Sequence, residues 1–150
     1  MSLNLDPVAK AELRIRKPVD VVFEAFVNPD QITRFWFDKS TGPLALGANV
    51  EWCWTMYGFC VPVRVTEFID GEKIHMTWGD GDDLSRLEWT FAGRDDGTTL
   101  VTMINKGFKG TDDEKMAKAL DSNGGFHLVV AAAKAYLEHG IKLNVVEDKF

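Results

Sequence analysis

The stretch that decides the fold is Val50-Glu51-Trp52-Cys53-Trp54-Thr55-Met56, in which large apolar side chains recur at every second residue. Successive side chains of a β-strand point to opposite faces, so Trp52 and Trp54 share one face. The same spacing recurs around Trp78 and Trp89. It predicts an antiparallel sheet with one buried, tryptophan-rich face and one face in water.

A tryptophan-rich face is informative because the indole ring is large and its N–H needs a partner when it is buried. We expect this face both to pack against a helix and to line a cavity. The same alternation, followed along the chain, predicts strands at about 10–16, 48–56, 59–68, 72–78, 84–91 and 98–104.

Tight turns connect most of these strands. Asp70-Gly71 and Asp96-Gly97 are hairpin signals, because glycine accepts a positive φ angle, and Tyr57-Gly58 is a third. Strands joined in this way are antiparallel. Between the first two strands, the helical spacing of apolar residues predicts two short helices, with Asn28 capping the second.

The apolar period changes after the last strand. Thr111-Asp112-Asp113-Glu114 is a capping box that opens a short helix ending at about residue 120. We expect residues 121–125 to interrupt it and a longer helix to cover about 126–139, stopped by Gly140. The order of elements predicts an α+β fold, in which a curved antiparallel sheet of about six strands wraps around a long C-terminal helix.

The length of the chain predicts a single domain over residues 1–150, with its core at about 10–140. Residues 141–150 form a C-terminal extension. Its first part, 141–146, is too apolar for a disordered end, so we expect it to pack back on the domain or across a dimer contact.

The charge balance excludes some classes of function. Seventeen basic and twenty-three acidic side chains give a net charge of −6, which disfavours binding to nucleic acid or to an anionic membrane. No apolar run reaches the roughly 18 residues of a membrane span, and the N-terminus lacks a secretory signal. We therefore expect a cytoplasmic protein, in which Cys53 and Cys60 are free thiols although they flank a predicted hairpin.

Four stretches carry a family resemblance. They are Ile15-Arg16-Lys17-Pro18-Val19-Asp20-Val21-Val22-Phe23-Glu24-Ala25-Phe26, Pro29-Asp30-Gln31-Ile32-Thr33-Arg34-Phe35-Trp36, Gly71-Glu72-Lys73-Ile74-His75-Met76-Thr77-Trp78, and Gly124-Gly125-Phe126 running into Ala135-Tyr136-Leu137-Glu138. In this order they resemble the START-like (SRPBCC) superfamily, also called the Bet v allergen or polyketide cyclase-like fold. Within it, the resemblance is greatest to the bacterial stand-alone form of the activators of the heat-shock protein ATPase.

The resemblance implies a helix-grip fold with a hydrophobic cavity between the curved sheet and the last helix. In such folds the cavity commonly holds a lipid-like or aromatic molecule. The superfamily shares no universal catalytic set, so no catalytic residue is carried over to this chain. The function predicted is the binding of a hydrophobic or aromatic small molecule in that cavity.

Candidates for the ligand site follow from strand parity and from the resemblance. Apolar side chains of the buried face and of the last helix would form the walls, Trp36 and Phe37 would close one end, and His127 would lie at the mouth. Arg34 is a candidate for holding a polar group there. The candidate ligand-binding residues are Trp36, Phe37, Trp52, Trp54, Met76, Trp78, Leu87, Trp89, Phe126, His127 and Val130.

Two other functions stay open at this stage. An enzyme of the cyclase, hydrolase or dehydratase type would use the same cavity and would need a titratable group buried among the aromatic rings. Strand parity places almost every charged residue outside, which disfavours this function. A co-chaperone-like activator of a heat-shock ATPase would instead need an exposed surface for its partner.

No catalytic residue, metal site or cofactor is predicted. Ser40, Ser85 and Ser122 have no supporting nucleophile motif, and the three histidines are not at metal-ligand spacing. The acidic loop 80–83 departs from the calcium-loop pattern. The partners expected are therefore a hydrophobic small molecule, with a homodimer left open, and neither nucleic acid nor a membrane.

Overall fold

The structure is a computed structural model that describes residues 5–149, so residues 1–4 and 150 of the predicted domain lie outside it. All the described strands form one antiparallel sheet in the order β1-β7-β6-β5-β4-β3-β2. The elements in chain order are β1 (Ala9–Ile15), α1 (Val19–Val27), α2 (Pro29–Ile32), β2 (Lys39–Ser40), β3 (Asn49–Trp54), the 3₁₀ turn η1 (Thr55–Tyr57), β4 (Phe59–Ile69), β5 (Lys73–Trp78), the 3₁₀ turn η2 (Gly81–Asp83), β6 (Ser85–Gly93), β7 (Thr99–Lys106) and α3 (Asp112–His139).

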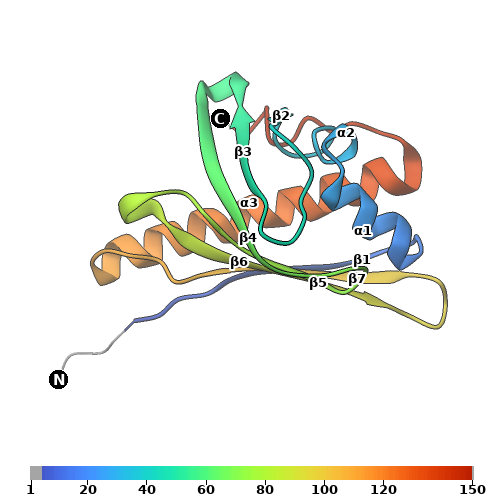
Figure 1. Cartoon of the computed structure of the whole chain (residues 1–150), viewed down its shortest axis with the longest axis horizontal. Coiled ribbons are helices and arrows are strands. Elements are labelled where there is room, and N and C mark those ends of the chain that lie inside the picture. Colours follow the sequence, from blue (N-terminus) through green and yellow to red (C-terminus); the bar gives the residue numbers. More distant parts are fainter. Residues whose placement is uncertain (1–4, 150) are drawn as a thin grey trace.

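The sheet curves around α3, as the predicted helix-grip fold requires (Figure 1). The helix packs mainly on β1 and β7, while α1 packs on β6. Helices α1 and α2 lie on the same side of the sheet as α3, and Phe35 beyond α2 contacts Tyr136 of α3. A β-bulge between Val65 and Glu67 interrupts the pairing of β4 with β5, and such a bulge bends its strand.

The local signals read from the sequence are mostly confirmed. The Asn28 side chain accepts a hydrogen bond from the Asp30 N–H at the start of α2, and Thr111 caps α3 in the same way through Glu114. Gly71 and Gly97 take positive φ angles in their hairpins. Gly140 ends α3 in the left-handed conformation.

The predicted interruption of the last helix at residues 121–125 is wrong, because α3 is continuous from Asp112 to His139. Short polar side chains usually break helices by competing for the backbone's hydrogen bonds. Here they bond to other elements instead: Ser122 Oγ donates to Asn105 Oδ1 at 2.8 Å, and Asn123 Oδ1 accepts from the Lys10 N–H at 3.0 Å. The two glycines of this segment keep a negative φ angle.

The sheet has seven strands where about six were expected. The additional strand, β2, consists of Lys39 and Ser40 and pairs with Cys53 and Trp52 of β3. Two residues are too few to show an alternating pattern, so the sequence carried no signal for this strand.

The buried face is the one that strand parity predicted. Eight of its side chains on β3, β5 and β6 are at most 9% exposed: Val50, Trp52, Trp54, Ile74, Met76, Leu87, Trp89 and Phe91. Trp78, at the end of β5, was predicted for the same face and is only partly buried. The rings of Trp52 and Trp89 stack at 5.8 Å, and Phe37 stacks on the other side of Trp52 at 4.5 Å. The indole N–H of Trp89 has no hydrogen-bond partner among the described residues, which makes it a costly group in this core.

Cys53 and Cys60 form a disulfide, so the prediction of free thiols is wrong. The two residues are directly opposite each other in the β3–β4 pair, with their Cα atoms 4.0 Å apart. The prediction of free thiols rested on the expected compartment, whereas the strand register brings the two sulfur atoms together. No helix within residues 5–149 has the length and apolarity needed to cross a membrane. The cytoplasmic location stays a prediction.

The C-terminal extension packs back on the domain through Val145 and Val146, which lie against the hydrophobic core. The Tyr57 hydroxyl donates a hydrogen bond to the carbonyl of Val146. Ile141 and Leu143, by contrast, remain exposed.

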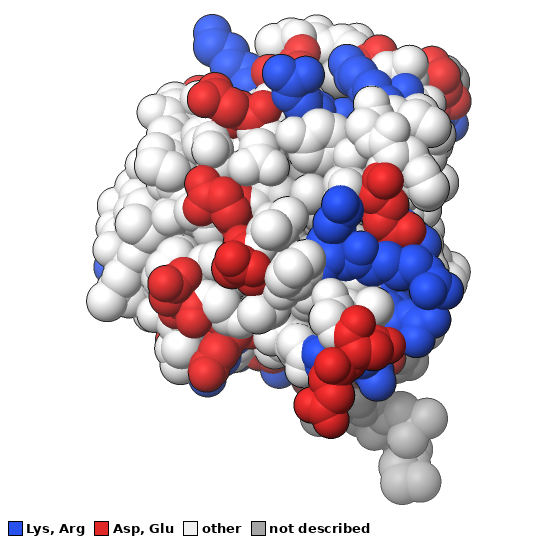
Figure 2. Space-filling model, turned by 90° about the vertical axis from the view of Figure 1, so that its right-hand side faces the viewer, with Lys and Arg blue, Asp and Glu red and all other residues white. Residues whose placement is uncertain are grey.

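Surface charge is mixed on the face shown in Figure 2, where Lys and Arg side chains lie next to Asp and Glu side chains and a broad uncharged area adjoins them. Such a face differs from the continuous basic footprint of nucleic-acid-binding proteins.

Candidate ligand-binding groove

A pocket of about 520 Å³ lies between the β3–β4 hairpin, the end of β5 and the middle of α3. Its wall is mainly aromatic and aliphatic, and the C-terminal extension closes part of it. The lining residues are Trp36, Trp54, Tyr57, Phe59, Trp78, Asp121, Ser122, Gly125, Phe126, Leu128, Val129, Val146 and Lys149. We call this space the aromatic pocket.

A second pocket of about 340 Å³ adjoins the first and shares Trp54, Phe59, Trp78, Asp121 and Ser122 with it. It extends towards β6 and β7 and has more polar residues. Its further lining residues are Val61, Gly79, Asp83, Ser85, Asn105, Phe108 and Lys118. We call this space the polar pocket, and the two together the groove.

Contacts between rings hold the walls of the aromatic pocket in place. Trp36 meets Phe126 edge to face at 5.4 Å, and Trp78 contacts Phe126 at 5.8 Å. Trp54 stacks on Phe59 at 5.2 Å. Phe59 is 49% exposed, so the groove opens to solvent at this ring. The arrangement is a preformed apolar surface with access from one side.

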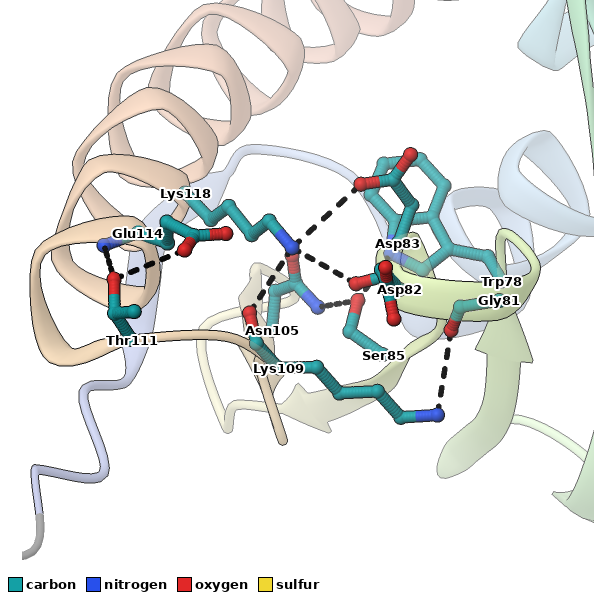
Figure 3. Close-up of polar contacts among 10 residues, drawn as sticks. All are labelled: Trp78, Gly81, Asp82, Asp83, Ser85, Asn105, Lys109, Thr111, Glu114 and Lys118. Atoms are coloured by element: carbon teal, nitrogen blue, oxygen red, sulfur yellow. Dashed lines mark hydrogen bonds and ion pairs between the residues drawn. The ribbon is translucent and has the colours of Figure 1, made fainter.

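The floor of the polar pocket is a hydrogen-bonded group of buried side chains. Asn105 is 1% exposed and Ser85 6% exposed. Asn105 donates to Ser85 Oγ at 2.9 Å, and Trp78 Nε1 donates to the same oxygen at 3.0 Å (Figure 3). Asn105 also donates to the Arg86 carbonyl at 2.8 Å. Ser122 completes the group from α3 through its bond to Asn105. These bonds fix the sheet, the helix and the Trp78 ring relative to one another.

The charged groups at the rim of the groove have partners of their own. Lys118 reaches from α3 to the carbonyls of Asp82 and Lys109, at 2.8 and 3.0 Å, and lies 3.6 Å from the Asp83 carboxylate (Figure 3). Lys149 lies 3.3 Å from the carboxylate of Asp121. Both ammonium groups are therefore neutralised by aspartates of the same rim.

The carboxyl groups with a displaced pKa lie outside the groove. A hydrogen bond from Lys106 lowers the pKa of Glu88 on the outer face of the sheet. Burial raises the pKa of Asp38, but hydrogen bonds from the Thr55 hydroxyl and N–H outweigh it and the pKa is lowered. These shifts stabilise carboxylates in structural pairs, and no acid or base chemistry in the groove follows from them.

The structure brings four of the residues predicted from sequence, Trp36, Trp54, Trp78 and Phe126, together around the aromatic pocket. His127 is exposed on α3, with Nδ1 2.6 Å from the Asn123 carbonyl. The other predicted residues lie in the core, away from the lining of the groove: Phe37, Trp52, Met76, Leu87, Trp89 and Val130. Arg34 borders a separate small pocket of about 10 Å³.

Sequence reasoning missed the polar floor of the groove. Asn105 has the same parity on β7 as Val101 and Met103, so it is a polar residue at a position where an apolar one is expected. That signal was readable, but the predicted strand ended at residue 104. Ser85 gave the same kind of signal within the predicted strand 84–91, since it shares the inward parity of Leu87 and Trp89 on β6. Ser122 gave none, because its role depends on the contact between α3 and β7.

The comparison with known families gives a direct result. Residues 16–138 match the family described as "Activator of Hsp90 ATPase homolog 1-like protein". The chain belongs to this family. No curated protein matches it.

Solved structures share the fold. Protein SSP2350 from Staphylococcus saprophyticus is 27% identical, with a TM-score of 0.78 over 91% of this chain and 95% of that one. DynU16, a putative protein in the dynemicin biosynthetic locus, is 22% identical with a TM-score of 0.78, over 92% of this chain and 49% of that one. The Aha1 dimer from Colwellia psychrerythraea is 14% identical with a TM-score of 0.74, over 89% of this chain and 97% of that one. This family member thus has the helix-grip fold that its sequence predicts.

Proposed function

We propose that the protein binds a hydrophobic or aromatic small molecule, lipid-like or polyketide-like, in the groove. The observation that carries the proposal is the aromatic pocket, whose volume of about 520 Å³ is walled by Trp36, Trp54, Trp78 and Phe126. Small-molecule sites typically measure roughly 300–1,000 Å³ and combine apolar walls with a few placed polar groups. The groove has both features.

Burial of apolar surface would provide the affinity. Each square ångström removed from water contributes about 25 cal/mol, and flat aromatic ligands add ring contacts of about 0.5–1.5 kcal/mol each. The rings of Trp54 and Phe59 are already held by their mutual contact, so little conformational freedom would be lost on binding.

Binding is better supported than catalysis. The ionisable groups of the rim are paired, and the buried floor consists of neutral side chains. A general acid or base needs a titratable group within reach of the substrate. The family description also suggests activation of a heat-shock ATPase, but the concave groove is a better fit for a small ligand than for a protein partner.

Native mass spectrometry of the protein as purified tests the proposal. We expect a species heavier than the chain, and release of an apolar small molecule on denaturation. Titration with 2-ethylnaphthalene, followed by tryptophan fluorescence, should show saturable binding because Trp36, Trp54 and Trp78 surround the site. A protein that carries no ligand and whose fluorescence does not respond to this hydrocarbon would refute the proposal.

The Colwellia relative is a dimer, and this supports a homodimer for the present chain as well. Sedimentation velocity over a range of protein concentrations distinguishes a dimer from a monomer.

A further inference from the structure

The hydrogen bonds on the floor of the polar pocket fix the positions of their protons. The Arg86 carbonyl can only accept, so the Asn105 atom that lies 2.8 Å from it is the amide nitrogen. The second hydrogen of this nitrogen is donated to Ser85 Oγ at 2.9 Å. The Asn105 oxygen then accepts from the Ser122 hydroxyl.

Ser85 therefore receives two hydrogen bonds on one oxygen. The second comes from Trp78 Nε1, at 3.0 Å, and an indole N–H can only donate. Both lone pairs of the Ser85 hydroxyl are used, and its own proton remains to be donated. Among residues 5–149 it finds no acceptor. Ser85 is 6% exposed, and a buried donor without an acceptor is costly.

We propose that the Ser85 hydroxyl donates a hydrogen bond to the ligand, and that the groove selects a neutral ring compound with a carbonyl group. This inference rests on the proposed function. Ser85 lines the polar pocket beside Trp78, whose ring also lines the aromatic pocket. A ligand whose rings lie between Trp54, Trp78 and Phe126 would place an acceptor substituent towards Ser85.

The paired charges at the rim of the groove favour a neutral ligand. A carboxylate would need a cation, and Lys118 and Lys149 are already paired with Asp83 and Asp121. The two aspartates would repel a further anion at the same rim. A ketone needs only one donor, which Ser85 supplies. Free fatty acids and other carboxylates are therefore expected to bind more weakly than neutral carbonyl compounds of the same shape.

Three probes of similar shape test the inference: 2-acetylnaphthalene, 2-ethylnaphthalene and 2-naphthoate. Ser85→Ala should weaken binding of the acetyl compound by about five- to tenfold, the value of one hydrogen bond, and change binding of the ethyl compound by less than about twofold. Ser85→Thr, which keeps the hydroxyl, should restore the affinity for the acetyl compound. Ser40→Ala, on β2 outside the groove, is the matched control and should behave as wild type.

A spectroscopic measurement on the wild type gives an independent readout. The carbonyl stretch of bound 2-acetylnaphthalene should lie below its value in an aprotic solvent, and return towards that value in Ser85→Ala. An unshifted stretch in the wild type would overturn the inference even if the variant does not fold. Tighter binding of 2-naphthoate than of 2-acetylnaphthalene would overturn the selection for neutral ligands.

The outcomes separate the two proposals. If the wild type binds both neutral probes and Ser85→Ala weakens them equally, or weakens neither, the groove binds ligands but Ser85 does not select them. If the wild type binds neither neutral probe, the inference about Ser85 fails, and if the purified protein also releases no apolar small molecule on denaturation, the proposed function fails with it.

Discussion

Trp54 and Phe59 face each other across the β3–β4 hairpin, with ring centroids 5.2 Å apart and ring planes inclined by 19°. They are the residues next to the disulfide-bonded pair Cys53 and Cys60. The disulfide therefore holds the two strands together beside the Trp54–Phe59 ring pair, which lines both pockets of the groove.

Removing the disulfide should lower stability. Replacing both cysteines by serine is expected to reduce the free energy of unfolding by about 2 kcal/mol, because the unfolded chain regains the freedom of a short loop. Denaturant unfolding with and without a thiol reductant measures the effect. The reductant should destabilise the wild type and leave the double-serine variant unchanged. Wild-type protein that shows two reactive thiols under non-reducing denaturing conditions would contradict the disulfide.

Replacement of Asn105 should show how much the polar floor stabilises the fold. Asn105→Ala removes bonds to Ser85, Ser122 and the Arg86 carbonyl and leaves buried groups unpaired. We expect a loss of about 2–3 kcal/mol in the free energy of unfolding. The exposed Asn49 at the start of β3 is the control, and Asn49→Ala should change the free energy of unfolding by less than about 0.5 kcal/mol. Equal effects of the two substitutions would show that the floor contributes no special stability.

The pH dependence of stability should contain a contribution from Glu138. Burial raises its pKa, but the Arg16 N–H, 2.8 Å away, and the Lys134 ammonium outweigh this and hold the pKa below its usual value. A lowered pKa in the folded state stabilises the protein above the unfolded-state pKa, and this stabilisation is lost as the pH falls through the folded-state pKa.

Glu138→Gln should therefore lower the free energy of unfolding by about 1 kcal/mol at pH 7. The difference in this free energy between variant and wild type should become smaller as the pH falls below about 5. Unfolding curves at several pH values measure this. All other carboxyl groups are present in both proteins, so the difference between the two pH profiles of unfolding free energy reports on Glu138 alone. The exposed Glu72 is the control, and Glu72→Gln should change the free energy of unfolding at pH 7 by less than about 0.5 kcal/mol. A gap that stays constant down to pH 3 would contradict the assignment.

The fold could be read from the sequence because its signals are local. Alternation around Trp52, the turn at Asp70-Gly71 and the cap at Thr111 each act within a few residues. The candidate site was read only in part. Parity places a side chain on the inner face, but it does not distinguish Trp54, which lines the groove, from Trp52, which stacks in the core. That difference depends on where α3 and the C-terminal extension lie.

The continuity of α3 leads to a test of the groove that spares the fold. Gly125 lines the aromatic pocket, and a Cβ there would meet only the Lys149 ammonium, at 3.8 Å. Gly125→Leu should therefore fill the pocket and weaken 2-ethylnaphthalene binding by about tenfold or more. It should also stabilise the helix by about 0.5–1 kcal/mol. The neighbouring Gly124 is exposed, so Gly124→Leu should give the same stabilisation and leave binding intact. Fluorescence titration and thermal unfolding of the pair measure both effects, and unchanged probe affinity in a folded Gly125→Leu protein would place the ligand elsewhere.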